Sequence, residues 1–256
     1  MKLAKDQIAR QFSRAAQTYD LGAQLQNEMA QRLIDEIPEN LDGQIVDLGC
    51  GTGWALQQIA NLNRFELTAV DLAPGMIEVA RSRVPVAVFH CADLEATPLQ
   101  NDSADLVFSN AAIQWCDLEL AIKEFTRICR PGGLVLFSTF GPETLKEIRS
   151  AWQAVETNFN RVHEFEPADS LELTIEQFGL QNVKVSSLIR ELKFESVDDL
   201  LANIKRLGAT NASTTRQTGL LGTRRYREFR NVLKSQFAQE QNLKLTFECI
   251  FASFQV

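Results

Sequence analysis

Histidine is scarce in this chain of 256 residues, and cysteine occurs only at scattered positions. With only two histidines, His90 and His163, the chain has little material for a His-rich metal centre or for acid–base catalysis by imidazole. No Cys-x-x-Cys pair occurs among the five cysteines, which are Cys50, Cys91, Cys116, Cys129 and Cys249. Their odd number and wide spacing argue against a disulfide framework and against a zinc site, so we expect no bound metal.

Long apolar runs are missing as well. No stretch approaches the ~20 apolar residues that a membrane-spanning helix requires, so we expect no membrane segment. The start of the chain carries Lys2, Lys5, Asp6 and Arg10 without an apolar core, which is not the pattern of a secretory signal. We therefore expect a cytoplasmic protein, and the 45% hydrophobic content suits one enlarged α/β domain over residues 1–256.

Outside one segment, acidic residues far outnumber basic residues. The net charge is −7, which disfavours a protein whose whole surface binds nucleic acid. Residues 205–234 include eight basic residues and one acid, a charge of +7, whereas the remainder has 18 basic and 32 acidic residues, a charge of −14. We expect this segment to form a localised basic face on an acidic protein.

The spacing of apolar residues predicts alternating strands and helices. Short apolar segments predict strands at 44–48, 66–70, 84–90, 105–109, 134–139, 182–192 and 243–251. Helical spacing between them, as at 74–81 and 118–128, predicts a Rossmann-like α/β fold with a mostly parallel seven-stranded sheet and helices on both faces. We expect residues 1–40 to form a helical cap, 44–139 the cofactor-binding core, and 140–256 the substrate-side helices and last two strands. The basic helical insertion, 197–237, would precede the last strand.

A glycine-rich loop follows the first predicted strand. The segment Asp47-Leu48-Gly49-Cys50-Gly51-Thr52-Gly53 leads from this strand directly into a helix. Glycine lets the backbone approach a ligand closely, and a helix N-terminus offers free N–H groups. The spacing G-x-G-x-G differs from the dinucleotide fingerprint, and Asp47 suits a cationic ligand better than a pyrophosphate. S-Adenosylmethionine, which has a sulfonium and an ammonium but no phosphate, meets this description.

Acidic residues also follow the next two predicted strands. Asp71 is placed to accept hydrogen bonds from both hydroxyls of a ribose. Asp93 could accept one from the amino group of adenine, and Leu72 and Met76 could contact the adenine ring.

Residues 44–139 resemble the class I S-adenosylmethionine methyltransferases. The resemblance rests on the glycine loop, Asp71, Asp93 and the segment Asp105-Leu106-Val107-Phe108-Ser109-Asn110. In that family the glycine loop holds the methionine end of the cofactor, the acid after the second strand holds ribose, and the acid after the third holds adenine. The resemblance therefore implies S-adenosylmethionine as cofactor, bound by Asp47, Gly49, Gly51, Gly53, Asp71, Leu72, Met76, Asp93, Leu94 and Asn110.

The sequence motifs exclude only some classes of methyl acceptor. The segment 109–112 lacks the Pro-Pro-aromatic pattern that resembles amino-methylating nucleic-acid enzymes, and the scarcity of histidine disfavours metal-assisted transfer. A carboxylate acceptor is already ionised at neutral pH and needs only positioning and desolvation. Three alternatives remain: a methyltransferase for another small carboxylate or lipid-like acceptor, a non-enzymatic adenosyl-binding module, and RNA methylation through the basic face.

Essentially the whole chain resembles the malonyl-acyl-carrier-protein O-methyltransferases of biotin synthesis. The resemblance rests on the segments 12–20 with Ala23, Leu25 and Gln26, 109–116, 140–145, 204–211 and 243–248. It implies methyl-ester formation on the free carboxylate of a malonyl group held as a thioester on acyl carrier protein. The ester hides a charge, so that fatty-acid enzymes elongate the chain toward pimeloyl.

The same resemblance implies roles for residues outside the core. The N-terminal helices of such methyltransferases usually cap the cofactor, so Tyr19 is expected at its methionine end. Gln114 and Trp115 would line the acceptor pocket, and no residue is assigned as a general base. Because carrier proteins present acidic helices, we expect the basic face, 205–234, to dock malonyl-acyl-carrier protein. The expected substrate-binding residues are Lys205, Arg216, Arg224, Arg225 and Arg227, with Lys205 or Arg216 nearer the malonyl carboxylate.

Overall fold

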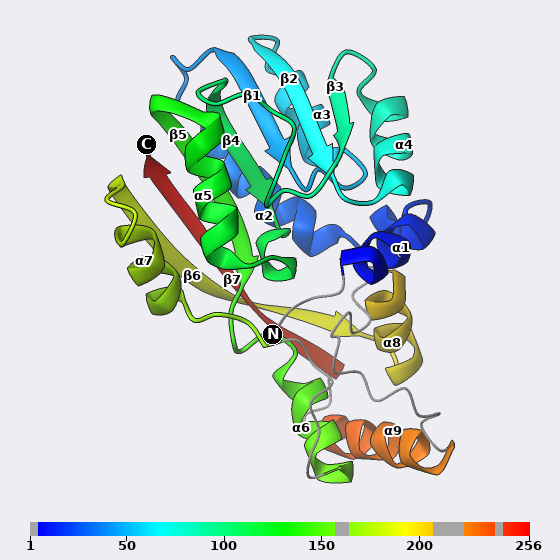
Figure 1. The fold of residues 1–256 in the computed structure, drawn as a ribbon. Helices are drawn as coiled ribbons and strands as arrows, with labels where there is room; N and C mark the ends of the chain where they lie inside the picture. The colour runs from blue at the N-terminus through cyan, green and yellow to red at the C-terminus, as the bar shows by residue number, and fades with distance from the viewer. Residues whose placement is uncertain (1–4, 157–163, 207–222, 239–242) are drawn as a thin grey trace.

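The computed structural model describes residues 5–156, 164–206, 223–238 and 243–256, which build one sheet with helices on both faces (Figure 1). The seven strands are β1 (Gly43–Leu48), β2 (Phe65–Asp71), β3 (Val88–Cys91), β4 (Ala104–Asn110), β5 (Cys129–Phe140), β6 (Gln181–Phe194) and β7 (Leu243–Gln255). Their order across the sheet is β3-β2-β1-β4-β5-β7-β6, and only β7 runs antiparallel to its neighbours. The predicted mostly parallel seven-stranded sheet is confirmed.

Successive residues of each central strand point to opposite faces, and each face has its own apolar core. On one face Ile45 and Leu106 pack with helices α2 (Gln24–Asp35), α3 (Trp54–Ala60), α4 (Pro74–Arg83), α6 (Lys146–Val155), α8 (Val197–Arg206) and α9 (Thr223–Ala238). On the other face Val46 and Val107 pack with α5 (Leu118–Ile128) and α7 (Ala168–Glu176). Continuously apolar strands are therefore buried on both sides, as their sequences predict.

Three predicted boundaries are corrected. The strand expected at 84–90 begins only at Val88, because the N–H of Val84 still donates to Ala80 O (2.9 Å) and ends α4. Strand β5 begins at Cys129 and includes Gly132, whose N–H donates to Val256 O (2.6 Å). Strand β7 extends to Gln255 because it pairs along its length with both β5 and β6.

The N-terminal region, helix α1 (Lys5–Ala15) and the 3-10 turn η1 (Tyr19–Leu21), lies at the edge of the sheet where the parallel strands end (Figure 1). We call residues 5–21, from the start of α1 to the end of η1, the cap. In the described parts of the chain no helix is long and apolar enough to span a membrane. Helices α8 and α9 lie between β6 and β7 in the chain, where the sequence predicts a basic helical insertion at 197–237.

Candidate functional site

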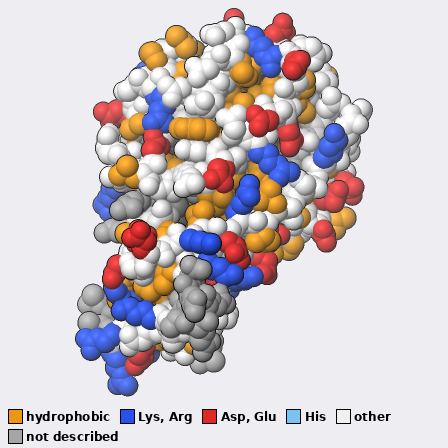
Figure 2. Space-filling view, turned by 180° about the vertical axis from the view of Figure 1, so that it is seen from behind, with side chains coloured by type: hydrophobic (Ala, Val, Ile, Leu, Met, Phe, Trp, Pro, Cys, Tyr) orange, Lys and Arg blue, Asp and Glu red, His pale blue; other side chains and the backbone are white. Residues whose placement is uncertain are grey.

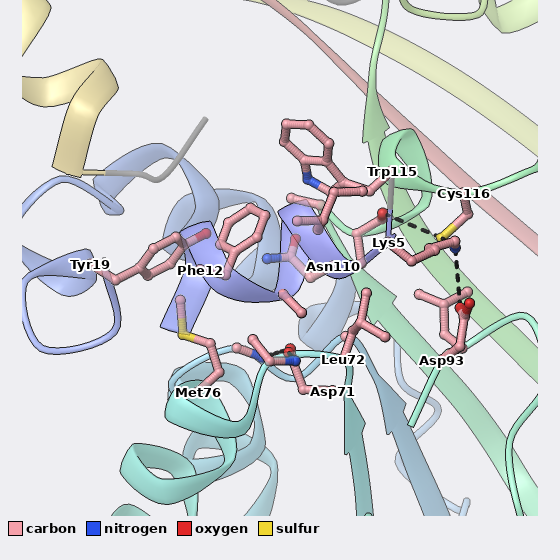
Figure 3. A pocket seen from close by; sticks show the side chains of 18 residues that line it. Lys5, Phe12, Tyr19, Asp71, Leu72, Met76, Asp93, Asn110, Trp115 and Cys116 are labelled. Atoms are coloured by element: carbon pink, nitrogen blue, oxygen red, sulfur yellow. Dashed lines mark hydrogen bonds and ion pairs between the residues drawn. The ribbon is translucent and has the colours of Figure 1, made fainter. Parts of the chain in front are cut away.

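One cavity, which we call the main cavity because it adjoins the glycine loop, lies between the cap and the carboxyl ends of the strands (Figure 3). From the cap come Lys5, Phe12 and Tyr19, and opposite them lie Asp71 and Met76. A neighbouring cavity behind the glycine loop shares Tyr19 with the first and is lined further by α2. Together the two cavities offer one elongated site, which suits a ligand with two chemically different ends.

The glycine loop has the backbone conformation that its sequence predicts. Gly49, Gly51 and Gly53 have φ values of +79°, +53° and +77°, a region that residues with a Cβ rarely adopt. A Cβ on Gly49 would stand 2.4 Å from Ala112 Cβ, so glycine is needed there for close packing as well. Gly49 and Gly51 line both cavities, whereas Gly53 lines neither and packs against Ala80.

Asp71 organises the loop in addition to facing the main cavity. Its Oδ2 accepts from the N–H of Gly51 (2.9 Å) and its Oδ1 from the N–H of Ala73 (2.8 Å). A carboxylate has about four lone-pair sites, so both oxygens keep capacity for a ligand. Burial raises the pKa of Asp71 to about 6, although these two backbone hydrogen bonds oppose the shift.

Two buried oxygens in the second cavity have no hydrogen-bond partner among the residues that the structure describes. They are Asp47 Oδ2 and Gln26 Oε1, and both residues line this cavity. Asp47 is only 1% exposed, and burial, with the nearby charge of Asp71, raises its pKa to about 8. Unpaired buried acceptors cost free energy, so this arrangement is typical of a site for a hydrogen-bond donor or a cation. Gln26 belongs to a segment noted in the sequence but has no predicted role there.

Tyr19 lies where the two cavities meet, and its hydroxyl points into the main one (Figure 3). That hydroxyl makes no hydrogen bond to the residues that the structure describes. Burial, together with Asp71 and Asp20, raises the pKa of Tyr19 well above its usual value, so the phenol stays neutral. Tyr19 is therefore placed to donate a hydrogen bond to a ligand between the two cavities, and its contact with the methionine end of the cofactor stays a prediction.

Asp93 lines the far end of the main cavity, but one of its oxygens is already engaged. Lys5 Nζ donates to Asp93 Oδ1 (3.1 Å) and to Glu95 Oε1 (2.5 Å), and lies 3.8 Å from Cys116 Sγ (Figure 3). Burial lowers the pKa of Lys5, but Cys116, Glu95 and Asp93 outweigh burial and raise it, so Lys5 stays charged. Sequence reasoning missed Lys5, because nothing local connects it to residues so far along the chain.

The remaining predicted cofactor residues surround the same space. Leu72, Met76 and Leu94 line the main cavity and offer apolar contact to a ligand. Asn110 lines both cavities, but its side chain also ties elements together: Nδ2 donates to Gln26 O (3.0 Å) and Oδ1 accepts from Ser138 (2.7 Å).

Gln114 and Trp115, predicted to line one acceptor pocket, face different cavities. Trp115 lines the main cavity, where its ring meets Phe12 edge-on at 5.5 Å between centroids. Gln114 lines a third cavity beside Thr139 and Phe165, and its Oε1 accepts from Thr139 Oγ1 (3.3 Å). Adjacent residues in the short turn η2 (Ile113–Trp115) point apart, which explains the difference.

The basic segment is described only in part. Arg216 and the side chain of Lys205 lie outside the described residues. Helix α9 is held by Phe229, which stacks on Trp152 of α6 at 4.0 Å, and it presents Arg224, Arg225 and Arg227 to solvent. Figure 2 shows Lys and Arg side chains gathered at this end of the molecule.

Most arginines of α9 already have acidic partners. Arg224 pairs with Glu228 (3.0 Å) and Arg225 with Glu156 (3.3 Å). Arg230 pairs with Asp198 (2.7 Å). Arg227 makes no ion pair with the described residues. No cluster of three or more metal-ligating side chains occurs among the residues that the structure describes.

Comparisons with known proteins show that the chain is similar to methyltransferases. Residues 46–137 match a family model described as a methyltransferase domain. The chain is 35% identical over 226 residues to a malonyl-acyl-carrier-protein O-methyltransferase of Yersinia pestis, covering 88% of this chain and 83% of that protein. It is 37% identical over 228 residues to the biotin biosynthesis bifunctional protein BioHC of Cellvibrio japonicus, covering 88% of this chain but only 45% of that protein.

Among solved structures, the YcgJ protein of Bacillus subtilis superimposes with a TM-score of 0.63 at 16% identity. The match covers 89% of this chain and 97% of that one, and it shows a shared fold.

Proposed function

Because the chain belongs to the malonyl-acyl-carrier-protein O-methyltransferases, we propose that it transfers a methyl group from S-adenosylmethionine to the free carboxylate of malonyl-acyl-carrier protein. The methyl ester removes the negative charge of the malonyl carboxylate, so that the acyl chain can be elongated toward pimeloyl for biotin. The observation that carries this proposal is the pair of unpartnered buried oxygens, Asp47 Oδ2 and Gln26 Oε1, behind the glycine loop.

The residues present fit S-adenosylmethionine. Asp47 and Gln26 would accept from its ammonium, and Asp71 would accept from the ribose hydroxyls with its remaining lone pairs. Asp93 Oδ2, which has no hydrogen bond within the described residues, would accept from the adenine amino group, while Leu72 and Met76 contact the ring. When bound, this cofactor supplies an electrophilic methyl group on a sulfonium.

The chain's own contribution to the reaction is positioning and desolvation. A malonyl carboxylate is ionised at neutral pH, so no side chain has to remove a proton. Phe12 and Trp115 line the main cavity with aromatic rings that would shield a bound cofactor from water, and Tyr19 offers a neutral hydroxyl as donor. Fixed orientation in a dry site is a sufficient source of rate enhancement for such a transfer.

The acyl carrier protein would dock on α9. Arg224, whose side chain is 91% exposed despite its pair with Glu228, and Arg227 both face solvent and could meet acidic helices. Arg225 and Arg230 serve instead to fasten α9 to Glu156 and Asp198. Lys205 and Arg216 remain the predicted partners of the malonyl carboxylate.

Mass spectrometry of malonyl-carrier protein, incubated with the protein and S-adenosylmethionine, tests the function. We expect the carrier-bound malonyl group to gain the mass of one methyl group, and free malonate to react far more slowly. No gain on the carrier, together with methylation of another small carboxylate, would instead support the alternative acceptor class.

A further inference from the structure

The cap buries three apolar side chains, those of Ile8, Ala15 and Ala16. Its buried residue Ala16 packs with Ala73 and Met76 in a small cluster that is separate from the two main cores. Phe12 and Tyr19 join this cluster only as partly buried side chains. Because two of the three buried side chains are alanines, apolar packing supplies only part of the attachment of the cap, which lines the main cavity.

An ion-pair cluster fastens the first turn of α1 at the adenine end of the main cavity. Lys5, whose side chain is 28% exposed, bridges Asp93 and Glu95, whose side chains are 30% and 13% exposed. Glu95 is fixed in turn, because its Oε1 also accepts from the N–H of Asp117 (2.8 Å). Partly buried and mutually oriented charges attract more strongly than exposed pairs do.

A second cluster fastens η1 at the methionine end. Arg83, in the last turn of α4, pairs with Asp20 and donates to Thr52 Oγ1 (3.2 Å). Thr52 Oγ1 donates in turn to Asp20 Oδ1 (2.6 Å). Since Thr52 belongs to the glycine loop and Asp20 follows Tyr19, one guanidinium links the loop, the cap and α4.

We propose that Lys5 and Arg83 are positioning residues that fasten the cap across the cofactor site and thereby set the rate of cofactor exchange. The inference rests on the proposed function, since it assumes that S-adenosylmethionine and S-adenosylhomocysteine occupy the site. Ile8, Phe12 and Tyr19 line the cavity from the cap side, so a bound cofactor lies beneath them. Its escape requires the cap to lift, and lifting breaks one ion-pair cluster or both.

Binding kinetics of S-adenosylhomocysteine alone test this inference. Trp115 lines the main cavity and Trp54 the second, so stopped-flow tryptophan fluorescence should report binding. We expect Lys5→Met and Arg83→Met each to raise the dissociation rate constant about threefold to tenfold. Lys5→Arg and Arg83→Lys should restore a rate constant near that of the unmodified protein.

Salt separates electrostatic fastening from apolar packing. Raising ionic strength should speed dissociation from the unmodified protein and shrink its difference from the two Met variants. Arg130→Met is the matched control, because Arg130 pairs with Asp105 (2.6 Å) near the start of β4, at the opposite end of the sheet, and should leave exchange unchanged.

The outcomes are distinguishable. Dissociation rates that stay the same in both Met variants, or that change equally in Arg130→Met, would overturn the inference while leaving cofactor binding established. No binding by the unmodified protein would overturn the proposed function itself. Thermal melting of each variant checks that a faster rate does not reflect a loss of folded protein.

Discussion

At Asp47, burial favours the neutral carboxyl, whereas an ammonium ligand favours the ionised carboxylate. Its carboxyl is buried, its pKa is raised to about 8, and Oδ2 has no partner. In the free protein the neutral form therefore dominates at neutral pH, whereas an ammonium ligand requires the ionised form. Binding must then release a proton, and binding that releases protons strengthens as pH rises.

We accordingly predict that affinity for S-adenosylmethionine rises roughly tenfold from about pH 6 to about pH 7 and levels off near the raised pKa. Calorimetry across this range measures the effect. Asp47→Asn should bind more weakly and lose most of the dependence. A pH-independent affinity would show that Asp47 does not face the ammonium. At saturating cofactor, kcat should stay flat, because the malonyl carboxylate needs no base.

Asp71 is predicted to contribute both to cofactor affinity and to the stability of the folded protein. Asp71→Ala removes acceptors for the ribose hydroxyls, each charge-assisted hydrogen bond being worth about 1.5–3 kcal/mol, so affinity should fall at least about tenfold. It also releases the N–H groups of Gly51 and Ala73, so the melting temperature should fall too. Calorimetry and thermal melting give the two quantities. Unchanged affinity would remove Asp71 from the ribose site.

At the scale of elements, the contact between α1 and α4 requires a glycine. Gly75 lies in the first turn of α4, and a Cβ there would stand 2.8 Å from Ser13 O and 2.9 Å from Ser13 Cα. The N–H of Gly75 donates to Ser13 Oγ (3.2 Å). The cap can therefore approach α4 only because position 75 has no side chain.

Gly75→Ala should push the cap away from the site and weaken cofactor binding several-fold. Overpacking costs about 1–3 kcal/mol, and the better helix propensity of alanine offsets only part of this. Glu78→Ala, on an exposed position of the same helix, is the control for propensity and should leave affinity unchanged. Equal affinities of the two variants would contradict the close-approach argument.

A second prediction at the scale of elements concerns helix α9. Arg224→Glu with Arg227→Glu should raise KM for malonyl-carrier protein about tenfold, and more at low salt, because rim charges act on encounter. Activity on a short malonyl thioester should barely change. Lys123→Glu with Lys184→Glu makes the same charge change at exposed positions of α5 and β6. An equal loss of activity with both substrates would contradict the docking hypothesis.

For the whole molecule, the candidate site lies where the cap, α2 and the edge of the sheet meet. The cap, α2, the glycine loop and the ends of β2 and β4 all line the two cavities. A ligand bound there contacts each of them and favours the folded state by mass action.

We predict that S-adenosylhomocysteine at about one hundred times its Kd stabilises the fold by about 2.7 kcal/mol. For a chain of this size that is a rise of about 5–10 °C in melting temperature, measurable by calorimetry. Malonate at the same concentration, which lacks the adenosyl group, is the control. The absence of any rise with S-adenosylhomocysteine would contradict the assignment of these cavities to the cofactor.

The sequence by itself determined the sheet, the glycine loop and the acids at the strand ends. Apolar periodicity and the freedom of glycine act over a few neighbouring residues, and Gly49, Asp71 and Asp93 lie where these local rules place them. Boundaries such as Val88 shifted, because hydrogen bonds at a helix end compete with strand pairing.

Only the tertiary structure decided which distant side chains meet. Lys5 reaches Asp93 across 88 positions of sequence, and Gln26 shares a cavity with Asp47, although nothing local links either pair. The predicted basic face likewise proved partly neutralised, since Arg225 and Arg230 found acids on other elements. Such contacts depend on how whole elements pack, because side chains far apart in the chain approach only when the elements that carry them are docked.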